Sequence, residues 1–344
     1  MLEKSLKKNT IYAYVIALGG GPMSRVYVTR LLPPKAVERL SDVDAVFFQE
    51  DRPIDRSSLL EGVKDAEGLI CILTDTIDED VMDAASGLRV ISCCAAGVDK
   101  IDVDAATRRG ILVTNTPDAL TETTADLAWT LLLDAARRVS EGDRYIRQGR
   151  FVGWGPLLLN GVDVYGKTLG IVGAGRIGGA VARRATAFHM NILYHNRNRN
   201  RILEEDTGAV YVSFEELLER SDFVSLHTPL TPGTKNMFGE NEFSMMKRSA
   251  VFINTARGGC HDEVALVEAL RNGVIRAAGL DVFHEEPKVH PGLLELENVV
   301  LCPHLGSASE ETRRRMALDA VVNLLDALND RRPRYVVNPE VLRG

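Results

Sequence analysis

Short apolar runs alternate with helical patterns along the first third of the chain. Five runs have the length and β-branched content of buried strands, at residues 26–28, 45–48, 69–73, 90–93 and 111–113. Between them, polar and apolar positions repeat with helical spacing at residues 34–40, 55–63, 78–85 and 102–108. This alternation predicts βαβ units that form a parallel sheet covered on both faces.

The same alternation of short apolar runs and helical patterns returns in the second half of the chain. Further strands are predicted at residues 168–172, 192–195, 223–226, 250–253, 277–280 and 299–301. A long amphipathic pattern at residues 121–148 precedes them, and a last helix at 308–328 could return to the first lobe. The pattern predicts the α/β class, with two doubly wound parallel-sheet (Rossmann-like) lobes and an active site in the interlobe cleft.

The length of 344 residues agrees with two domains, because it exceeds what one hydrophobic core usually organises. We expect a substrate-binding (catalytic) domain at residues 23–122 and 307–344. A nucleotide-binding Rossmann domain is expected at residues 123–306. Residues 1–22, which carry three lysines before a short apolar run, are interpreted as an N-terminal extension whose purpose the sequence does not reveal.

Composition excludes several classes of protein. The formal net charge of −7 argues against a nucleic-acid partner, since such binding needs clustered cations. No run reaches 18 apolar residues, so we expect no membrane span. The five cysteines show no metal-ligand spacing, and three of them lie in strand-like runs. They predict reduced thiols, no metal and a cytoplasmic protein.

A glycine-rich motif, Gly-Ala-Gly-Arg-Ile-Gly, directly follows the predicted strand at 168–172 and opens a helical pattern. In a dinucleotide site the first glycine permits a tight turn, the second lets the backbone approach a pyrophosphate, and the third allows close helix–strand packing. The alternative is a glycine-rich turn without a ligand. The cofactor-binding residues predicted here are Gly173, Gly175, Arg176, Ile177 and Gly178.

The next strand bears on the choice of cofactor. NAD-binding sheets usually place an acidic residue at its end, where this chain has His195 followed by Asn196, Arg197 and Arg199. Arginine suits a 2′-phosphate, so we predict that NADPH is preferred and that NADH is possible. The alternative is that both arginines only solvate the loop, partly neutralised by the acidic residues 204–206.

Three predicted strands are each followed by a side chain with catalytic potential: Arg257, Glu286 and His304. The arginine can hold a substrate carboxylate and polarise a ketone, while the histidine can protonate the oxygen as hydride arrives. The glutamate, bonded to the other ring nitrogen, would favour the imidazolium and hold its orientation. Taken singly, each has a plain alternative as a surface ion pair, a loop charge or a packed ring.

These motifs resemble the D-isomer-specific 2-hydroxyacid dehydrogenase family, and the resemblance runs from about residue 26 to 339. It covers the glycine motif, the His-Thr-Pro-Leu corner at 227–230 and the segments 254–258, 279–287 and 303–306. It implies that Arg257 binds substrate, that His304 is the acid/base and that Glu286 is its partner. Within the family the chain is most similar to the glyoxylate and hydroxypyruvate reductases.

The resemblance also implies further roles. Backbone amides of Ala96 and Gly97 would help to bind the substrate carboxylate, although the family often has Val-Gly there, and Leu73 and Thr74 would face the substrate from a second loop. Trp154 would reach a neighbouring subunit's site in a homodimer, or else simply pack the interlobe linker. The remaining cofactor contacts would come from Thr124, Thr228, Pro229, Thr255 and Asp281.

The expected activity is NAD(P)H-dependent reduction of a small 2-oxo acid to the D-2-hydroxy acid, with glyoxylate or hydroxypyruvate as substrate. A dehydrogenase for another 2-oxo acid, such as 2-ketogluconate or phenylpyruvate, is an alternative with the same fold and chemistry. A dinucleotide-sensing, corepressor-like binding protein is an alternative from another class. The arginine, glutamate and histidine disfavour it, because a sensor has no need of them.

Overall fold

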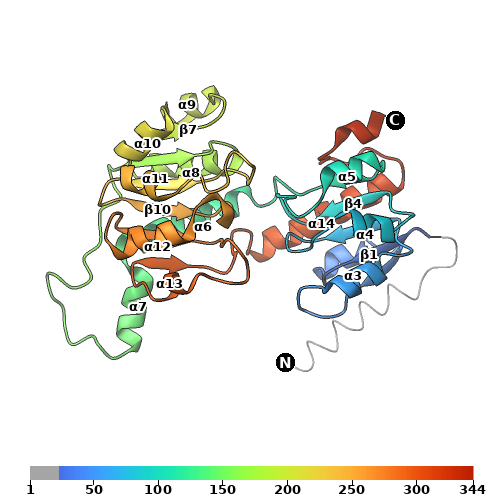
Figure 1. The fold of residues 1–344 in the computed structure, drawn as a ribbon, viewed down its shortest axis with the longest axis horizontal. Helices are drawn as coiled ribbons and strands as arrows, with labels where there is room; N and C mark the ends of the chain where they lie inside the picture. Colours follow the sequence, from blue (N-terminus) through green and yellow to red (C-terminus); the bar gives the residue numbers. More distant parts are fainter. Residues whose placement is uncertain (1–22, 344) are drawn as a thin grey trace. The chain divides into compact units, whose positions relative to one another are not determined.

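A computed structural model describes residues 23–343 and divides the chain into two compact units (Figure 1). Of these residues, 23–120 and 309–343 form the first unit, and 121–308 form the second. The predicted domain boundaries therefore lie two residues inside those of the second unit. Each unit is built on a parallel sheet, which confirms the predicted fold class. Residues 1–22, the predicted extension, lie outside the described residues.

The first unit contains five parallel strands in the order β2-β1-β3-β4-β5. Nearly every residue in these strands is buried, because helices cover both faces of the sheet. The strands are β1 (Arg25–Val28), β2 (Asp44–Phe47), β3 (Gly68–Cys71), β4 (Val90–Cys93) and β5 (Leu112–Thr114). Each differs from its predicted range by no more than two residues at either end.

The helices of this unit are α2 (Pro34–Glu38), α3 (Arg56–Gly62), α4 (Glu79–Ala84), α5 (Val103–Arg108) and α14 (Glu310–Leu328). The C-terminal helix α14 packs across β3 and β4, far from it in sequence. Its Leu324 lies so close to Gly68 that an added Cβ atom would be 3.1 Å from the leucine methyl carbon. Ser92 of β4 also donates a hydrogen bond to the carbonyl oxygen of Ala320 at 2.7 Å. The last helix thus belongs to the first unit's core.

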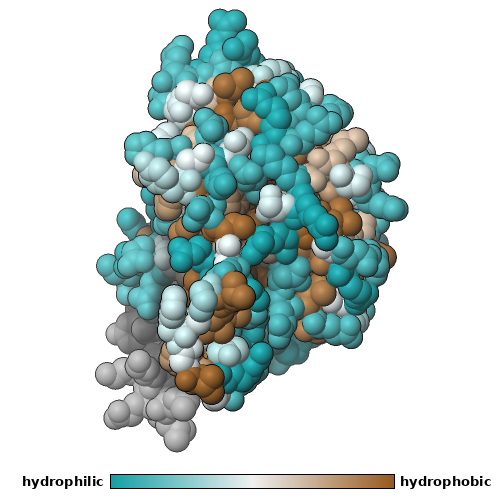
Figure 2. All heavy atoms as spheres, turned by 90° about the vertical axis from the view of Figure 1, so that its left-hand side faces the viewer, coloured by the Kyte–Doolittle hydropathy of each residue, from teal (hydrophilic) through white to brown (hydrophobic). Residues whose placement is uncertain are grey.

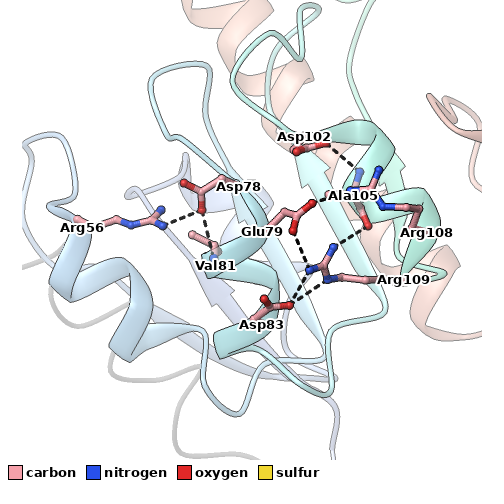
Figure 3. Close-up of polar contacts among 9 residues, drawn as sticks. All are labelled: Arg56, Asp78, Glu79, Val81, Asp83, Asp102, Ala105, Arg108 and Arg109. Atoms are coloured by element: carbon pink, nitrogen blue, oxygen red, sulfur yellow. Dashed lines mark hydrogen bonds and ion pairs between the residues drawn. The ribbon is translucent and has the colours of Figure 1, made fainter.

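Charged side chains connect α3, α4 and α5 at the surface (Figure 3). Asp78 and Asp102 cap α4 and α5 by accepting hydrogen bonds from the first-turn amides of Val81 and Ala105. Asp78 also pairs with the guanidinium of α3, at 2.7 Å from Arg56. The remaining pairs join Arg108 to Glu79 and Arg109 to Glu79 and Asp83.

The second unit contains seven parallel strands in the order β12-β11-β10-β9-β6-β7-β8. The chain starts in the middle at β6 and runs first to one edge and then to the other, so the strand order reverses between β6 and β9. The strands are β6 (Thr168–Val172), β7 (Asn191–His195), β8 (Val210–Tyr211), β9 (Phe223–Leu226), β10 (Val251–Asn254), β11 (Ala277–Leu280) and β12 (Val299–Leu301). The strand β8, which has two exposed residues at the sheet edge, was not predicted from the sequence.

Helices α6 (Thr121–Arg137) and α8 (Arg176–Thr186) cover one face of this sheet, where Trp129 donates a hydrogen bond to the carbonyl oxygen of Val181 at 3.1 Å. The other face carries α10 (Phe214–Arg220), α11 (Glu240–Met245), α12 (Glu263–Arg271) and α13 (Pro291–Leu294). The other helical segments are α7 (Val139–Arg147), α9 (Arg201–Thr207) and the 3₁₀ turn η1 (Gly258–Cys260), with a second 3₁₀ turn, η2 (Pro339–Arg343), in the first unit. No helix among residues 23–343 is long and apolar enough to cross a membrane.

The amphipathic pattern at 121–148 forms two helices rather than one. The break is at Arg138, whose φ of 57° lies in the left-handed region. Asp134 stabilises the break by accepting hydrogen bonds from the amide and hydroxyl of Ser140, and Glu141 pairs with the Arg138 guanidinium at 2.6 Å. Hydrogen bonds from a side chain to nearby backbone groups compete with those of the helix, so they can end one helix and begin the next.

Candidate active site

The glycine loop lies where the strand order of the second unit reverses, at the carboxyl ends of β6 and β9. Gly173 has a φ of +95°, and a Cβ atom there would lie 2.7 Å from the carbonyl carbon of His227. Only glycine fits this close approach of two backbones. The loop therefore occupies the position where doubly wound sheets bind ligands.

The other two glycines have different surroundings. A Cβ atom on Gly178 would lie 2.2 Å from the carbonyl oxygen of Gly173, so helix α8 sits tightly against the loop. A Cβ atom on Gly175 would meet nothing within 4 Å, and no side chain caps α8 there. Arg176 and Ile177 form its exposed and half-buried first turn. Open space beside uncapped helix amides suits the phosphates of a dinucleotide.

Two buried polar atoms at the neighbouring strand ends have no hydrogen-bond partner among the described residues. They are Nδ1 of His227, after β9, and the hydroxyl of Thr255, after β10. Thr228 lies beside them, with its hydroxyl 3.7 Å from the sulfur of Met237, and Pro229 follows. Unpaired polar atoms at the sheet's ligand-binding edge are what a bound dinucleotide would satisfy, so these residues fit the cofactor.

Beyond β7, the predicted phosphate-binding residues differ in their contacts. Arg199 forms an ion pair with Glu204 at 2.7 Å, and that carboxylate also accepts the hydroxyl of Tyr194. The hydrogen bonds from Arg199 and Tyr194 lower the pKa of Glu204. Arg197 is exposed and makes no side-chain hydrogen bond or ion pair within residues 23–343, whereas Asn196 donates to the carbonyl oxygen of Asn198 at 3.0 Å.

The structure brings Glu286 and His304 together. The ring nitrogen Nδ1 of His304 lies 2.8 Å from Oε2 of Glu286, and the amide of Phe283 donates to Oε1 at 3.0 Å. About a quarter of each of the two side chains is exposed. Burial raises the pKa of Glu286, but the hydrogen bond and charge of His304, the Phe283 amide and the charge of Arg257 outweigh it, so the net pKa is lowered. The carboxylate is therefore ionised at neutral pH.

Arg257 is placed by a tight contact between two loops. A Cβ atom on Gly258 would lie 2.0 Å from the carbonyl carbon of Phe283, so the arginine loop packs directly on the segment that leads to Glu286. The Arg257 guanidinium also donates to the carbonyl oxygen of Ala256 at 2.7 Å. All three predicted catalytic residues thus belong to the second unit, and the guanidinium is close enough to lower the pKa of Glu286.

Two residues predicted to contact the cofactor also shape the loop that carries His304. Asp281 accepts hydrogen bonds from the amides of Leu305 at 2.6 Å and Gly306 at 2.8 Å. The hydroxyl of Thr124 donates to the carbonyl oxygen of Gly306 at 3.0 Å. Burial raises the pKa of Asp281, although these amides and His304 oppose the rise. This support fixes a loop in which His304 itself has a left-handed φ of 56°.

The predicted substrate-binding residues of the first unit follow neighbouring strands. Leu73 and Thr74 come after β3, while Ala96 and Gly97 come after β4, which pairs with β3 in the sheet. The side chain of Asn115 holds the second loop by donating to the carbonyl oxygen of Ala96 at 2.7 Å. These four residues therefore share one edge of the first unit's sheet.

Trp154 lies apart from the strand ends, in the segment between α7 and β6. Its side chain is 86% exposed, so it packs against little else in the second unit. Both interpretations of Trp154, a contact with a neighbouring subunit's site and packing of the interlobe linker, therefore stay predictions.

Comparison with known proteins gives the family. Residues 129–306 match the NAD binding domain of the D-isomer specific 2-hydroxyacid dehydrogenases. The chain is 50% identical to a glyoxylate reductase of Korarchaeum cryptofilum over 93% of its length and 97% of the relative's. The chain belongs to the D-isomer specific 2-hydroxyacid dehydrogenase family. It is an oxidoreductase of this family and carries a nicotinamide dinucleotide-binding domain.

Solved structures of similar proteins agree with this assignment. A glyoxylate reductase from Paecilomyes thermophila has a TM-score of 0.84 and 38% identity, with 93% of this chain and 100% of that chain covered. An NADPH-dependent glyoxylate/hydroxypyruvate reductase of Sinorhizobium meliloti, solved in complex with NADP and malonate, has a TM-score of 0.81 and 35% identity, with 92% and 97% covered.

The structure of this dehydrogenase also adds residues that the sequence analysis missed. Asn200 caps α9 and donates to the carbonyl oxygen of Ala174, which joins the arginine loop to the glycine loop at 2.9 Å. Asn254 and His261 lie beneath Arg257 and contact each other at 3.0 Å. Asn200 precedes a helical pattern and was detectable as a cap, but nothing in the sequence links Asn254 to His261.

Proposed function

We propose that this dehydrogenase reduces a small 2-oxo acid, glyoxylate or hydroxypyruvate, to the 2-hydroxy acid with NADPH as the preferred cofactor. The observation that carries the proposal is the 2.8 Å contact between His304 and an ionised Glu286, with Arg257 near enough to act on the same carboxylate. The relatives named glyoxylate reductase support this choice of substrate.

Each of the three side chains has one role. Arg257 holds the substrate carboxylate with two parallel hydrogen bonds and draws electron density from the ketone. His304 donates a proton from its Nε2 to the ketone oxygen, because its Nδ1 faces Glu286. Glu286 stays ionised and balances the imidazolium. The reduced nicotinamide, when bound, supplies the hydride to the ketone carbon.

The substrate and the roles of the side chains are tested with the purified protein. Oxidation of NADPH is followed by absorbance with glyoxylate, hydroxypyruvate, phenylpyruvate and 2-ketogluconate. We expect the first two to react with the highest kcat/KM and His304→Ala to lose at least about a hundredfold in kcat while it still binds NADPH. Full turnover by His304→Ala would remove the acid role. Equal or faster reaction with the larger acids would reject the proposed substrate.

The preference for NADPH is assigned to Arg197 rather than equally to both arginines. Arg199 is already engaged by Glu204, whereas the exposed Arg197 is available for a 2′-phosphate. We therefore expect Arg197→Ala to weaken NADPH binding about tenfold and to leave NADH binding unchanged. Arg199→Ala is the matched control and should have a smaller effect. Equal loss of affinity for both cofactors in Arg197→Ala would contradict this assignment.

We also propose that the enzyme is a homodimer that uses the segment between α7 and β6. Four large apolar side chains of this segment are more than half exposed: Phe151, Val152, Trp154 and Leu157. Figure 2 shows the side of the molecule on the left of Figure 1, where this segment lies, with hydrophobic groups in brown among hydrophilic ones in teal. Exposed apolar groups of this kind are typical of subunit interfaces.

The mass in solution, measured by light scattering during size-exclusion chromatography, tests the dimer. We expect twice the mass of one chain for the wild-type protein and a shift toward one chain mass for the double variant Trp154→Ser, Leu157→Ser. A wild-type protein with the mass of one chain at all concentrations would refute the dimer without affecting the proposed reaction.

A further inference from the structure

A fully buried histidine, His261, ends the loop that carries Arg257. His261 follows η1 at 0% exposure, and its ring packs edge to face on Phe252 with 5.8 Å between centroids. Its Nδ1 lies 3.0 Å from the side-chain amide nitrogen of Asn254, while its Nε2 has no hydrogen-bond partner among the described residues. A leucine would pack in this core without leaving a polar atom unsatisfied. The imidazole must therefore have another reason to be there.

Asn254 contacts the backbone on both sides of Arg257. Its Oδ1 accepts a hydrogen bond from the amide of Ala256 at 2.9 Å, and its Nδ2 donates to the carbonyl oxygen of Arg257 at 2.9 Å. These two contacts fix which end of the amide is nitrogen. The second hydrogen on Nδ2 therefore points to His261, whose Nδ1 must accept it. The ring accordingly carries its proton on the orphaned Nε2.

We propose that His261 is a positioning residue for Arg257, because its Nδ1 holds the Asn254 amide that in turn sets the backbone around the arginine. The inference rests on the proposed function, in which Arg257 binds the carboxylate of the 2-oxo acid. The chain of contacts runs from the buried ring of His261 through the Asn254 amide to the backbone of Arg257, which carries the substrate-binding guanidinium. His261 acts only through its neighbour and touches no reacting atom.

The charge state of His261 agrees with this role. Burial lowers its pKa to about 4, although the charge of Asp262 opposes the shift. The ring is therefore neutral near pH 7, which an accepting Nδ1 requires. Charged, it would present a second N–H to the Asn254 amide and lose the contact.

Two substitutions separate positioning from simple packing. His261→Leu keeps most of the buried volume but removes the acceptor, whereas His261→Asn places an amide oxygen near the position of Nδ1 and loses ring volume. Positioning predicts that the KM for glyoxylate rises about tenfold in His261→Leu, with NADPH affinity little changed, and is largely restored in His261→Asn. Packing predicts the opposite order, because the asparagine leaves a cavity.

Binding of oxamate, an unreactive analogue of a 2-oxo acid, to the NADPH complex gives a second readout by calorimetry. The affinity for oxamate should fall in His261→Leu by about the same factor as the KM for glyoxylate rises. If that variant does not fold, His261→Gln replaces it, since its amide reaches the Nε2 position and misses Asn254. The inference is overturned if the KM is unchanged in His261→Leu (or in His261→Gln, where that variant replaces it). It is also overturned if the KM rises more in His261→Asn than in that variant. The wild-type assay comes first, so a protein inactive on every 2-oxo acid refutes the proposed function instead.

Discussion

Replacing Glu286 by glutamine tests the contact on which the proposed reaction depends. The substitution keeps the shape of the side chain and an acceptor for the Phe283 amide, but it removes the negative charge 2.8 Å from His304. A hydrogen bond to a charged group contributes about 1.5–3 kcal/mol. Because about a quarter of each side chain is exposed, we take the lower part of that range, about 1.5–2 kcal/mol. This corresponds to a loss of about 10- to 30-fold in kcat.

Steady-state kinetics with saturating NADPH and glyoxylate measures the loss, and the neighbouring residue provides the control. Glu285→Gln makes the same chemical change on a side chain that is 70% exposed and 3.9 Å from Lys288, so kcat should be unchanged. Because the pKa of Glu286 is lowered, its charge is present above the ordinary carboxyl range and is lost only as the pH falls below it. Assays between pH 6 and 8 therefore do not titrate it. Equal losses in the two variants, or a change of less than twofold in Glu286→Gln, would refute the reasoning.

Three further outcomes are expected. Burial lowers the pKa of His227 and His261 from 6.5 to about 4, so the unfolded chain binds more protons between these values. Denaturant titrations should therefore show stability falling as the pH drops from 6.5 to 4, by at most about 3 kcal/mol per histidine, and His261→Leu should flatten the fall. Gly178→Ala should weaken NADPH binding in fluorescence titrations and lower the melting temperature, because the added methyl group would lie 2.2 Å from a loop carbonyl oxygen. Asp102→Ala should cost about 1 kcal/mol in chemical denaturation through the lost cap, more than Arg108→Ala, whose exposed ion pair adds little.

The sequence predicted most of the fold because parallel strands buried on both faces are nearly continuous apolar runs. The strand at 168–172 and the C-terminal helix could be predicted for this reason, since their patterns report burial directly. Strand β8 could not, because two exposed residues at a sheet edge carry no periodic signal. The break at Arg138 was missed because the residues on both sides keep helical spacing, while the cause is a set of side-chain contacts to Asp134 and Glu141.

The candidate site was predictable only in part, for a related reason. Glycine spacing and position after a strand indicate a phosphate loop, and a polar residue after each of three strands indicates a shared edge. The sequence does not show whether a charged side chain is available to bind a ligand, because this depends on which residues lie beside it in the folded chain. The sequence placed Arg197 and Arg199 on equal terms, but Glu204 engages only the second among the described residues. The contact between Asn254 and His261 is hidden for the same reason.

The supports of Arg257 and His304 share one feature, which explains why a doubly wound sheet suits this chemistry. Arg257 is held by Asn254, the last residue of β10, and the loop of His304 is held by Asp281, the first residue after β11. Both supports are buried at the carboxyl end of a central strand, so the sheet itself fixes them. Asn254 accepts the amide of Ala256 and donates to the carbonyl oxygen of Arg257, while Asp281 accepts the amides of Leu305 and Gly306. The active loops can therefore carry left-handed and closely packed residues that would be costly on a free loop, because the strain is opposed by hydrogen bonds anchored in the core.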